Sequence, residues 1–192
     1  CSYNFGSALQ SFAMQTATQS LQHTVALIDY KSKDFDHYRL VNLEHPKSFI
    51  KFCQNARPLL RRRESFRTFW KKYFNLTSPY SYKTESKLNT LASEFDCFIC
   101  GSDQIWNLDC TGGAVEPFFL SFAGDKRRIA YAPSLAHTSF RPENFDKEQV
   151  ANLLSHFDFI SVREEETVPL FQPLTKKPIE VVLDPTLLLN SE

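Results

Sequence analysis

Four short apolar runs limit the folds open to this chain more than any other feature of its sequence. They span residues 95–100, 128–132, 157–162 and 179–183. Runs of this length, bounded by polar turns, are typical of strands buried inside a sheet. Helical patterns precede the first run and follow the second and third. The helix after the second run is expected to begin at Asp146, which can cap it, and the helix after the third run is expected to carry Glu164, Glu165 and Glu166 in its first turn. This alternation of strands and helices predicts parallel pairing in a layered α/β domain.

The amino-terminal part of the chain adds further predicted elements. Apolar residues at helical spacing predict a helix over 7–21, and a strand over 23–30 follows it. Residues 48–75 carry two helical stripes, and Pro58 is expected to separate them because proline removes a helix hydrogen bond. A short helix is expected over 84–94.

Polar side chains crowd the chain directly after the first of the four apolar runs. The segment 101–107 reads Gly-Ser-Asp-Gln-Ile-Trp-Asn and has neither a helical nor a strand period. Leaving such groups unpaired in a core costs about 1–3 kcal/mol each. The segment therefore suits the wall of a polar site. Its candidate site residues are Ser102, Asp103, Gln104, Trp106 and Asn107.

Other polar residues lie next to the remaining predicted strands. They are Asn4, Gly6, Ser134, His137, Arg163 and Asp184. The first two precede the first helix and would follow a strand missing from this chain. The carboxyl ends of parallel strands meet at one edge of a sheet, and ligands bind outside that edge. We therefore expect these residues to share one site with the segment 101–107.

Asp103 and Arg163 are the strongest candidates for chemistry. Asp103 suits a base that accepts a proton from a substrate hydroxyl, or a group that orients one. An aspartate here also suits a cap of its own turn. The planar fork of Arg163 suits a carboxylate or phosphate, and the alternative is a salt bridge to Glu165 or Glu166.

Each of the other candidates has a plain structural alternative. Trp106 either offers a flat apolar face to a sugar ring or belongs to the core. The turn from Asn4 to Ser7 either presents backbone N–H groups to an anion or simply caps a helix. His137 is a general acid or a surface residue, and Asp184 contacts a ligand or fixes a turn.

A basic run with interleaved aromatic residues stands out in a chain whose formal net charge is zero. Its cations are Arg57, Arg61, Arg62, Arg63, Arg67, Lys71 and Lys72, with Glu64 as its one acid. Overall neutrality gives no global field that favours nucleic acid. The run indicates either peripheral contact with an anionic membrane through 57–72, or a helix with a solvated basic face and a buried aromatic face. We expect no nucleic-acid partner.

The cysteines indicate a reducing, cytoplasmic setting. Their number, five, is odd, and their spacing forms no disulfide framework. Cys97 and Cys100 form a C-x-x-C inside a predicted strand, where they would face opposite sides. No metal site is therefore expected. No apolar run is long enough to span a bilayer.

Taken in order along the chain, these segments resemble the polysaccharide pyruvyl transferase family. The resemblance runs through residues 4–10 and 101–107, then through 128–132 and 160–164, and it closes with 182–189. It covers most of the chain outside the part that contains the basic run.

The resemblance implies a Rossmann-like layered α/β domain with a mainly parallel sheet, similar to one half of a GT-B two-domain enzyme. It implies one N-terminal domain over 1–189 with a helical insertion at about 46–94, and a linker that starts at 190–192. A C-terminal domain would lie outside this chain, and the chain alone is expected to be inactive.

The resemblance also implies a reaction. A pyruvyl group would pass from phosphoenolpyruvate, as donor substrate and with no cofactor, to a sugar or glycolipid acceptor in bacterial exopolysaccharide biosynthesis. Two alternatives stay open, because a fold of this class supports many chemistries. One is a GT-B-like glycosyltransferase that uses a nucleotide-sugar, and the other is a non-catalytic glycan-binding domain.

Overall fold

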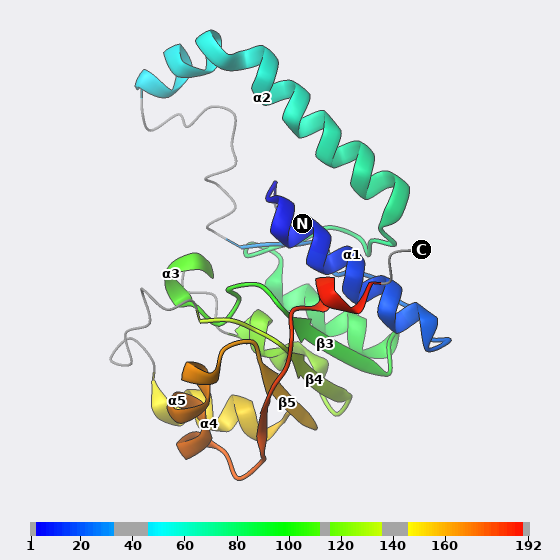
Figure 1. The fold of residues 1–192 in the computed structure, drawn as a ribbon, viewed down its shortest axis with the longest axis vertical. Helices are drawn as coiled ribbons and strands as arrows, with labels where there is room; N and C mark the ends of the chain where they lie inside the picture. Colours follow the sequence, from blue (N-terminus) through cyan, green and yellow to red (C-terminus); the bar gives the residue numbers. More distant parts are fainter. Residues whose placement is uncertain (1–2, 33–45, 112–115, 136–145, 190–192) are drawn as a thin grey trace.

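A four-stranded parallel sheet organises the protein (Figure 1). The structure is a computed structural model, and it describes residues 3–32, 46–111, 116–135 and 146–189. The strands of the sheet are β3 (Cys97–Gly101), β4 (Arg127–Tyr131), β5 (Phe159–Val162) and β6 (Ile179–Val181), in that order. All three pairings are parallel, which confirms the predicted layered α/β fold.

The predicted strand over 23–30 is wrong in extent. In this part of the chain, β1 (Tyr30–Lys31) pairs in parallel with β2 (Tyr80–Ser81), and Leu27 forms an isolated bridge with Leu76. Pairing before β1 is limited to this bridge because Pro79 lies directly before β2 in the partner segment, and proline has no N–H to donate to the ladder.

One face of the main sheet carries the core. Cys100, Ala130 and Ile160 lie side by side in register, and all three are buried. Helix α4 (Lys147–Ser155) packs here through buried apolar residues that belong to the same cluster. The helix begins where it was predicted, because Asp146 Oδ1 accepts hydrogen bonds from the first backbone N–H groups.

The opposite face of the sheet is only partly covered. Ile99, Ile129 and Phe159 share a row on it, and Phe159 is 65 % exposed. Helix α1 (Phe5–Ser20) covers its carboxyl edge. A Cβ added to Gly101 would lie 3.1 Å from the Tyr131 carbonyl oxygen and 3.4 Å from Met14 Cε of α1. Glycine at this strand end therefore lets the helix approach closely.

Helix α2 (Pro46–Tyr73) runs past α1 as one long element (Figure 1). The sequence predicted two helices separated near Pro58, and α2 does consist of two helical stretches that meet at Asn55, whose backbone is not helical (φ −122°, ψ 16°). A proline disturbs the turn before it, because its ring clashes with the carbonyl four residues earlier. The predicted break is therefore present as a kink just upstream of Pro58.

Aromatic packing fastens α2 to α1. The Phe12 ring lies 6.0 Å from the Phe69 ring and 5.7 Å from the Tyr73 ring, between centroids. Gln15 is buried, and its amide donates to the Tyr73 carbonyl and accepts from the Asn75 N–H.

Short helices complete the described chain. The segment predicted as a helix over 84–94 is the 3₁₀ helix η2 (Glu85–Ser93), and the helix predicted from Glu164 is split in two. The other short elements are α3 (Leu108–Thr111), η3 (Glu116–Phe119), η4 (Ser121–Ala123), η6 (Glu165–Thr167), α5 (Val168–Phe171), η7 (Gln172–Leu174) and η8 (Pro185–Leu188). No helix within these described ranges is long and apolar enough to cross a membrane.

The two cysteines of the C-x-x-C lie on opposite sides of β3, as predicted. Cys97 is exposed and Cys100 is buried. Burial raises the pKa of the Cys100 thiol above its ordinary value. Among the residues that the structure describes, no three His, Cys, Asp or Glu side chains gather in a way that would hold a metal ion.

Candidate functional site

The loops that follow all four strands of the main sheet meet at its carboxyl edge. Ser102, after β3, donates from Oγ to Asp184 Oδ2, after β6, at 2.8 Å. The Ser134 N–H, after β4, donates to the Asp103 carbonyl at 3.0 Å. Arg163 follows β5 and reaches both Ser102 and Asp184. The structure thus brings together five of the residues that were expected to share a site.

The guanidinium of Arg163 is the centre of this network. Its Nη1 donates to Asp184 Oδ2 at 3.1 Å and to the Ser102 carbonyl at 3.3 Å. Its Nε donates to Glu164 Oε1 at 3.0 Å. Within the described residues Nη2 makes no hydrogen bond, and the side chain is 32 % exposed. One edge of the guanidinium therefore remains open to a ligand.

Glu164 is a member of the network that the sequence did not reveal. Its Oε1 also accepts from Ser134 Oγ at 2.6 Å, and its Oε2 accepts from Thr167 Oγ1 at 3.5 Å. Glu165 and Glu166, the partners considered for Arg163, are both exposed and make no salt bridge with it. The helix starts one residue later than predicted, at Glu165, so Glu164 turns toward the site. The one sequence signal that could have indicated a site role for Glu164 was its position directly after an arginine at the end of a strand.

The network keeps its central charges ionised. Burial opposes ionisation of Arg163, but hydrogen bonds to Glu164 and Asp184 outweigh it and raise the pKa of the guanidinium. Burial likewise works against ionisation of Asp184, but hydrogen bonds from Thr186, Ser102 and Arg163 hold its pKa below the ordinary value. Burial, together with the charge of Asp184, raises the pKa of nearby Tyr131.

Asp103 serves its own turn and also faces α1. Its Oδ1 accepts from the Gln104 N–H at 2.9 Å, and its Oδ2 accepts from Ser7 Oγ. The carboxylate therefore lies against the first turn of α1, where the helix dipole favours negative charge. Asp103 is half-buried, so part of it remains accessible.

The start of α1 adopts the cap geometry that was the structural alternative to an anion site. Asn4 Oδ1 accepts from the Ser7 N–H at 3.1 Å, so Asn4 is a helix cap. A Cβ on Gly6 would lie 3.2 Å from Asn4 Oδ1, so glycine leaves room for this cap. The Asp103 carboxylate already supplies the negative charge that this helix end attracts.

Trp106 does not offer a face to a sugar ring. It is fully buried and stacks on Phe119 at 4.8 Å with an interplanar angle of 8°. Its Nε1 donates to the Phe118 carbonyl at 3.3 Å. The neighbouring aromatic residues offer a better environment than water for so large a ring, so the core interpretation is correct.

Several other predicted contact residues are buried and act as supports. Ser102, Asn107 and Ser134 are almost inaccessible, so they cannot touch a ligand while the network is intact. Gln104 is half-buried, and its Oε1 accepts from Cys110 Sγ at 2.9 Å. His137 lies outside the described residues. The accessible residues of the predicted site are therefore the half-buried Asp103, Gln104, Arg163 and Asp184, together with the exposed Asn4 and Gly6 at the start of α1.

The backbone is strained at two points beside this network. Ser102 has φ 24° and Ala132 has φ 53°, although neither is glycine. A non-glycine residue with a positive φ destabilises the folded state by about 1–3 kcal/mol, and strain of this kind clusters at functional sites. Both residues directly follow strands of the main sheet, where their conformations turn the chain into the site. No residue type in the sequence signals this strain.

The arrangement suits binding of a hydroxyl-rich molecule. Two carboxylates, those of Glu164 and Asp184, pair with the guanidinium of Arg163. A third carboxylate, that of Asp103, belongs to the loop after β3 at the same edge of the sheet. Ionised carboxylates accept hydrogen bonds from hydroxyl groups, and one of them can also take a proton. An anionic ligand meets a locally negative environment here and needs further cations.

Comparison with protein families identifies the family of this chain. The family profile described as "Polysaccharide pyruvyl transferase" matches residues 4–192, which is nearly the whole chain and includes every residue of the network. Comparisons with curated proteins and with solved structures found no match. The chain belongs to the polysaccharide pyruvyl transferase family.

Proposed function

We propose that the protein acts in the cytoplasm and transfers a pyruvyl group from phosphoenolpyruvate to a sugar of a cell-surface polysaccharide precursor. Family membership supports a transferase with a polysaccharide acceptor. The observation that carries the proposal is the network around Arg163 at the carboxyl edge of the sheet, with the accessible carboxylate of Asp103 beside it.

The proposed reaction defines what the protein must supply. The methylene carbon of phosphoenolpyruvate gains a proton, and the central carbon forms bonds to two sugar hydroxyl oxygens. Phosphate leaves, and the two hydroxyl protons must be removed. The protein therefore needs a base for a hydroxyl, an acid for the carbon, and cations for the carboxylate and phosphate. We assign no described residue to protonation of the carbon.

Asp103 is the proposed base or hydroxyl orienter. Its Oδ2 already accepts a hydrogen bond from a hydroxyl, that of Ser7, and a sugar hydroxyl offers the same chemistry. The Ser7 contact also holds the carboxylate in one orientation. Gln104 contributes a second fixed hydrogen bond through its backbone. A base held in this way loses little freedom when the acceptor binds.

Arg163 is the proposed contact for the donor. Two carboxylates already offset its charge, so it directs a donor anion through Nη2 and does not bind one tightly by itself. The accessible groups at this edge favour the acceptor sugar, and most of the donor charge must be met by other cations. The two-domain GT-B arrangement, in which a second domain supplies such cations, forms part of this proposal.

Phosphate release from phosphoenolpyruvate, with and without a glycan acceptor, tests the proposal in the full-length protein. Asp103→Asn and Arg163→Ala are compared with the matched controls Asp125→Asn and Arg127→Ala, which change exposed residues away from the network. General base catalysis contributes roughly 10²–10⁴-fold, so loss of at least a hundredfold is expected for Asp103→Asn. Undiminished turnover in both site variants overturns the assignment.

The same protein preparation separates the two alternatives. A glycosyltransferase is stabilised against heat by a nucleotide-sugar and not by phosphoenolpyruvate, because a ligand that binds the native state raises its apparent stability. A non-catalytic glycan-binding domain binds the acceptor in the Asp103→Asn variant as well as in the wild type, and it shows no affinity for either donor.

A further inference from the structure

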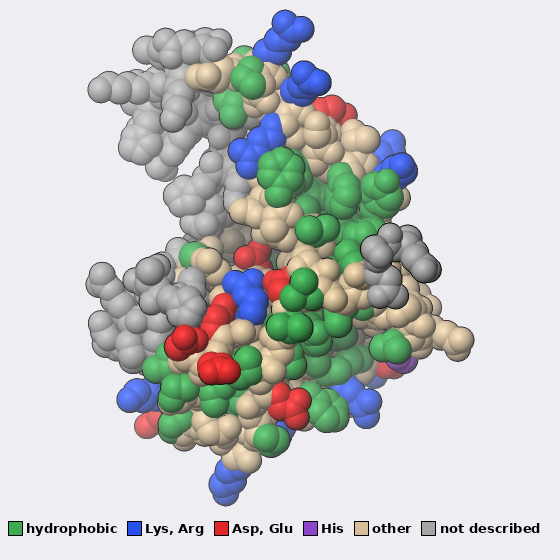
Figure 2. Space-filling model, in the orientation of Figure 1, with side chains coloured by type: hydrophobic (Ala, Val, Ile, Leu, Met, Phe, Trp, Pro, Cys, Tyr) green, Lys and Arg blue, Asp and Glu red, His purple; other side chains and the backbone are tan. Residues whose placement is uncertain are grey.

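Helix α2 presents a concentration of positive charge that the proposed reaction does not use. Seven Arg and Lys residues lie between positions 57 and 72 against one acid, in a chain whose formal net charge is zero. The remainder of the chain is therefore net negative. Six of these cations are exposed, and they are Arg57, Arg61, Arg62, Arg67, Lys71 and Lys72. Figure 2 shows Lys and Arg side chains along the upper edge of the molecule, where Figure 1 places α2.

Packing accounts for two of the seven cations. Arg62 Nη2 donates to the Tyr3 carbonyl at 2.8 Å, and Arg63 Nε donates to the Tyr3 hydroxyl at 2.9 Å. None of the seven forms a salt bridge within the described part of the chain. Lys72 interacts with the neighbouring Tyr73. The other four exposed cations have neither an acidic partner nor a hydrogen bond from their side chains in the described structure, and they are Arg57, Arg61, Arg67 and Lys71.

A buried aromatic face beneath the basic face of α2 was one of the two interpretations of this segment, and the described side chains fit it in part. Phe66 is buried against Tyr3 and α1, and Phe69 and Trp70 are half-buried. Apolar groups nevertheless reach the surface beside the cations. Leu60 of α2 is 48 % exposed, and Phe5, whose ring lies 4.9 Å from that of Phe66, is 75 % exposed.

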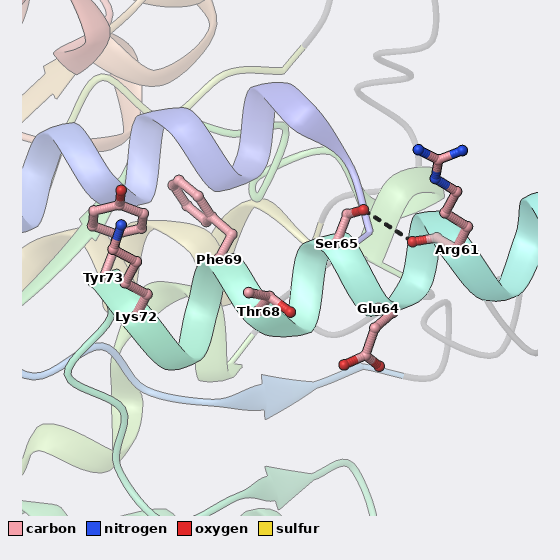
Figure 3. Close-up of a pocket in the computed structure, with 7 residues that line it drawn as sticks. All are labelled: Arg61, Glu64, Ser65, Thr68, Phe69, Lys72 and Tyr73. Atoms are coloured by element: carbon pink, nitrogen blue, oxygen red, sulfur yellow. Dashed lines mark hydrogen bonds between the residues drawn. The ribbon is translucent and has the colours of Figure 1, made fainter.

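A shallow groove runs along α2 between two of these cations (Figure 3). Its volume is about 460 Å³, and Arg61 and Lys72 lie toward its opposite ends. Between them the lining includes hydroxyl groups and the rings of Phe69 and Tyr73. Tyr73 is exposed, and Lys72 Nζ lies 4.8 Å from its ring centroid. Cations, hydroxyl groups and aromatic edges therefore share one surface.

We propose that this face of α2, together with Phe5, binds the surface of a bilayer that contains anionic phospholipids. Clusters of four to eight Lys and Arg residues on a helix are attracted to anionic headgroups, and each contributes independently of a defined pocket. Exposed aromatic and aliphatic groups beside the cations enter the boundary between headgroups and acyl chains. A nucleic acid satisfies the cations but leaves Leu60 and Phe5 in water, so lipid is the better match.

Vesicle co-sedimentation tests this inference on the full chain. The probes are phosphatidylcholine vesicles with and without phosphatidylglycerol, at low and high salt. The test variant is Arg61→Gln/Lys71→Gln/Lys72→Gln. The control, Lys87→Gln/Lys147→Gln/Lys176→Gln, removes the same charge from exposed positions outside α2. Near an anionic surface each cation contributes about 1 kcal/mol, so the test variant should lose roughly a hundredfold in partitioning.

The expected pattern is binding to vesicles with phosphatidylglycerol only, weakened by salt, lost in the α2 variant and kept in the control. Leu60→Ser should weaken binding further at constant charge. Equal binding by the α2 variant and the control overturns the inference. Binding to duplex DNA without binding to vesicles also overturns it. Phosphate release with a soluble acceptor should be unchanged in the α2 variant, so this inference can fail while the proposed reaction stands.

Discussion

Removal of the Asp184 carboxylate tests whether the network at the carboxyl edge holds the strand ends together. Its Oδ2 accepts from Ser102 and Arg163, and its Oδ1 accepts from the backbone and hydroxyl of Thr186. The side chain is only 23 % exposed. Asp184→Ala leaves the buried Ser102 hydroxyl without this acceptor, at a cost of about 1–3 kcal/mol, and removes the cap of η8, at about 1 kcal/mol. Asp184→Ala is therefore expected to lower the free energy of unfolding by about 2–4 kcal/mol.

The pH dependence of the isosteric variant Asp184→Asn has a defined sign. The pKa of Asp184 in the folded protein lies below its unfolded value of 3.8. The carboxylate therefore contributes stability above pH 3.8 that is lost as the pH falls through the folded pKa. The gap in unfolding free energy between wild type and Asp184→Asn should be constant near neutral pH and should narrow below about pH 4.

Urea unfolding monitored by tryptophan fluorescence measures both effects at several pH values. Asp125→Asn, an exposed aspartate outside the network, is the control and should change the unfolding free energy by less than about 0.5 kcal/mol. A decrease in unfolding free energy of less than about 1 kcal/mol for Asp184→Ala would refute the reasoning, because the four hydrogen bonds would then contribute little to stability. A gap for Asp184→Asn that does not change with pH would refute the electrostatic part alone.

Three further predictions follow from burial and capping. Trp106→Ala should lower the unfolding free energy measured in urea by about 3–5 kcal/mol, because it removes a buried ring that stacks on Phe119. An unchanged unfolding free energy would contradict the burial of Trp106. A thiol reagent should label Cys97 in the native protein and spare Cys100, because Cys100 is buried and its burial raises the pKa of the thiol. Equal labelling rates of the two cysteines, measured by mass spectrometry, would contradict the orientation of β3. Asp146→Ala should cost about 1 kcal/mol in the same unfolding assay, since it removes the cap of α4, and no change would show that the cap contributes nothing.

The main sheet was predictable because its strands are short, mainly apolar runs. Parallel strands buried on one or both faces need such runs, and their ends fall at polar turns. The short pair β1–β2 was not predictable in extent, because its length depends on a partner segment some fifty residues away, where Pro79 interrupts the ladder. The kink of α2 at Asn55 shows the same limit: Pro58 marks a disturbance, and packing decides whether the helix breaks or bends.

The location of the site was predictable from the sequence, but the roles of its residues were predictable only in part. Strand ends in a parallel sheet meet at one edge, so Asp103, Arg163 and Asp184 were expected together. The sequence did not distinguish the accessible members from buried supports such as Ser134, because both kinds are polar. Glu164 was assigned to a helix, and only the observed start of η6 places it beside Arg163.

The most direct test of the central claim is acceptor-dependent release of phosphate from phosphoenolpyruvate by the full-length protein, measured for wild type and Asp103→Asn. If this edge of the sheet binds and activates the acceptor, Asp103→Asn lowers kcat at saturating acceptor by at least about a hundredfold and changes the KM for phosphoenolpyruvate little. Wild-type kcat in the variant, or wild-type protein that releases no phosphate with any glycan acceptor, would contradict the account.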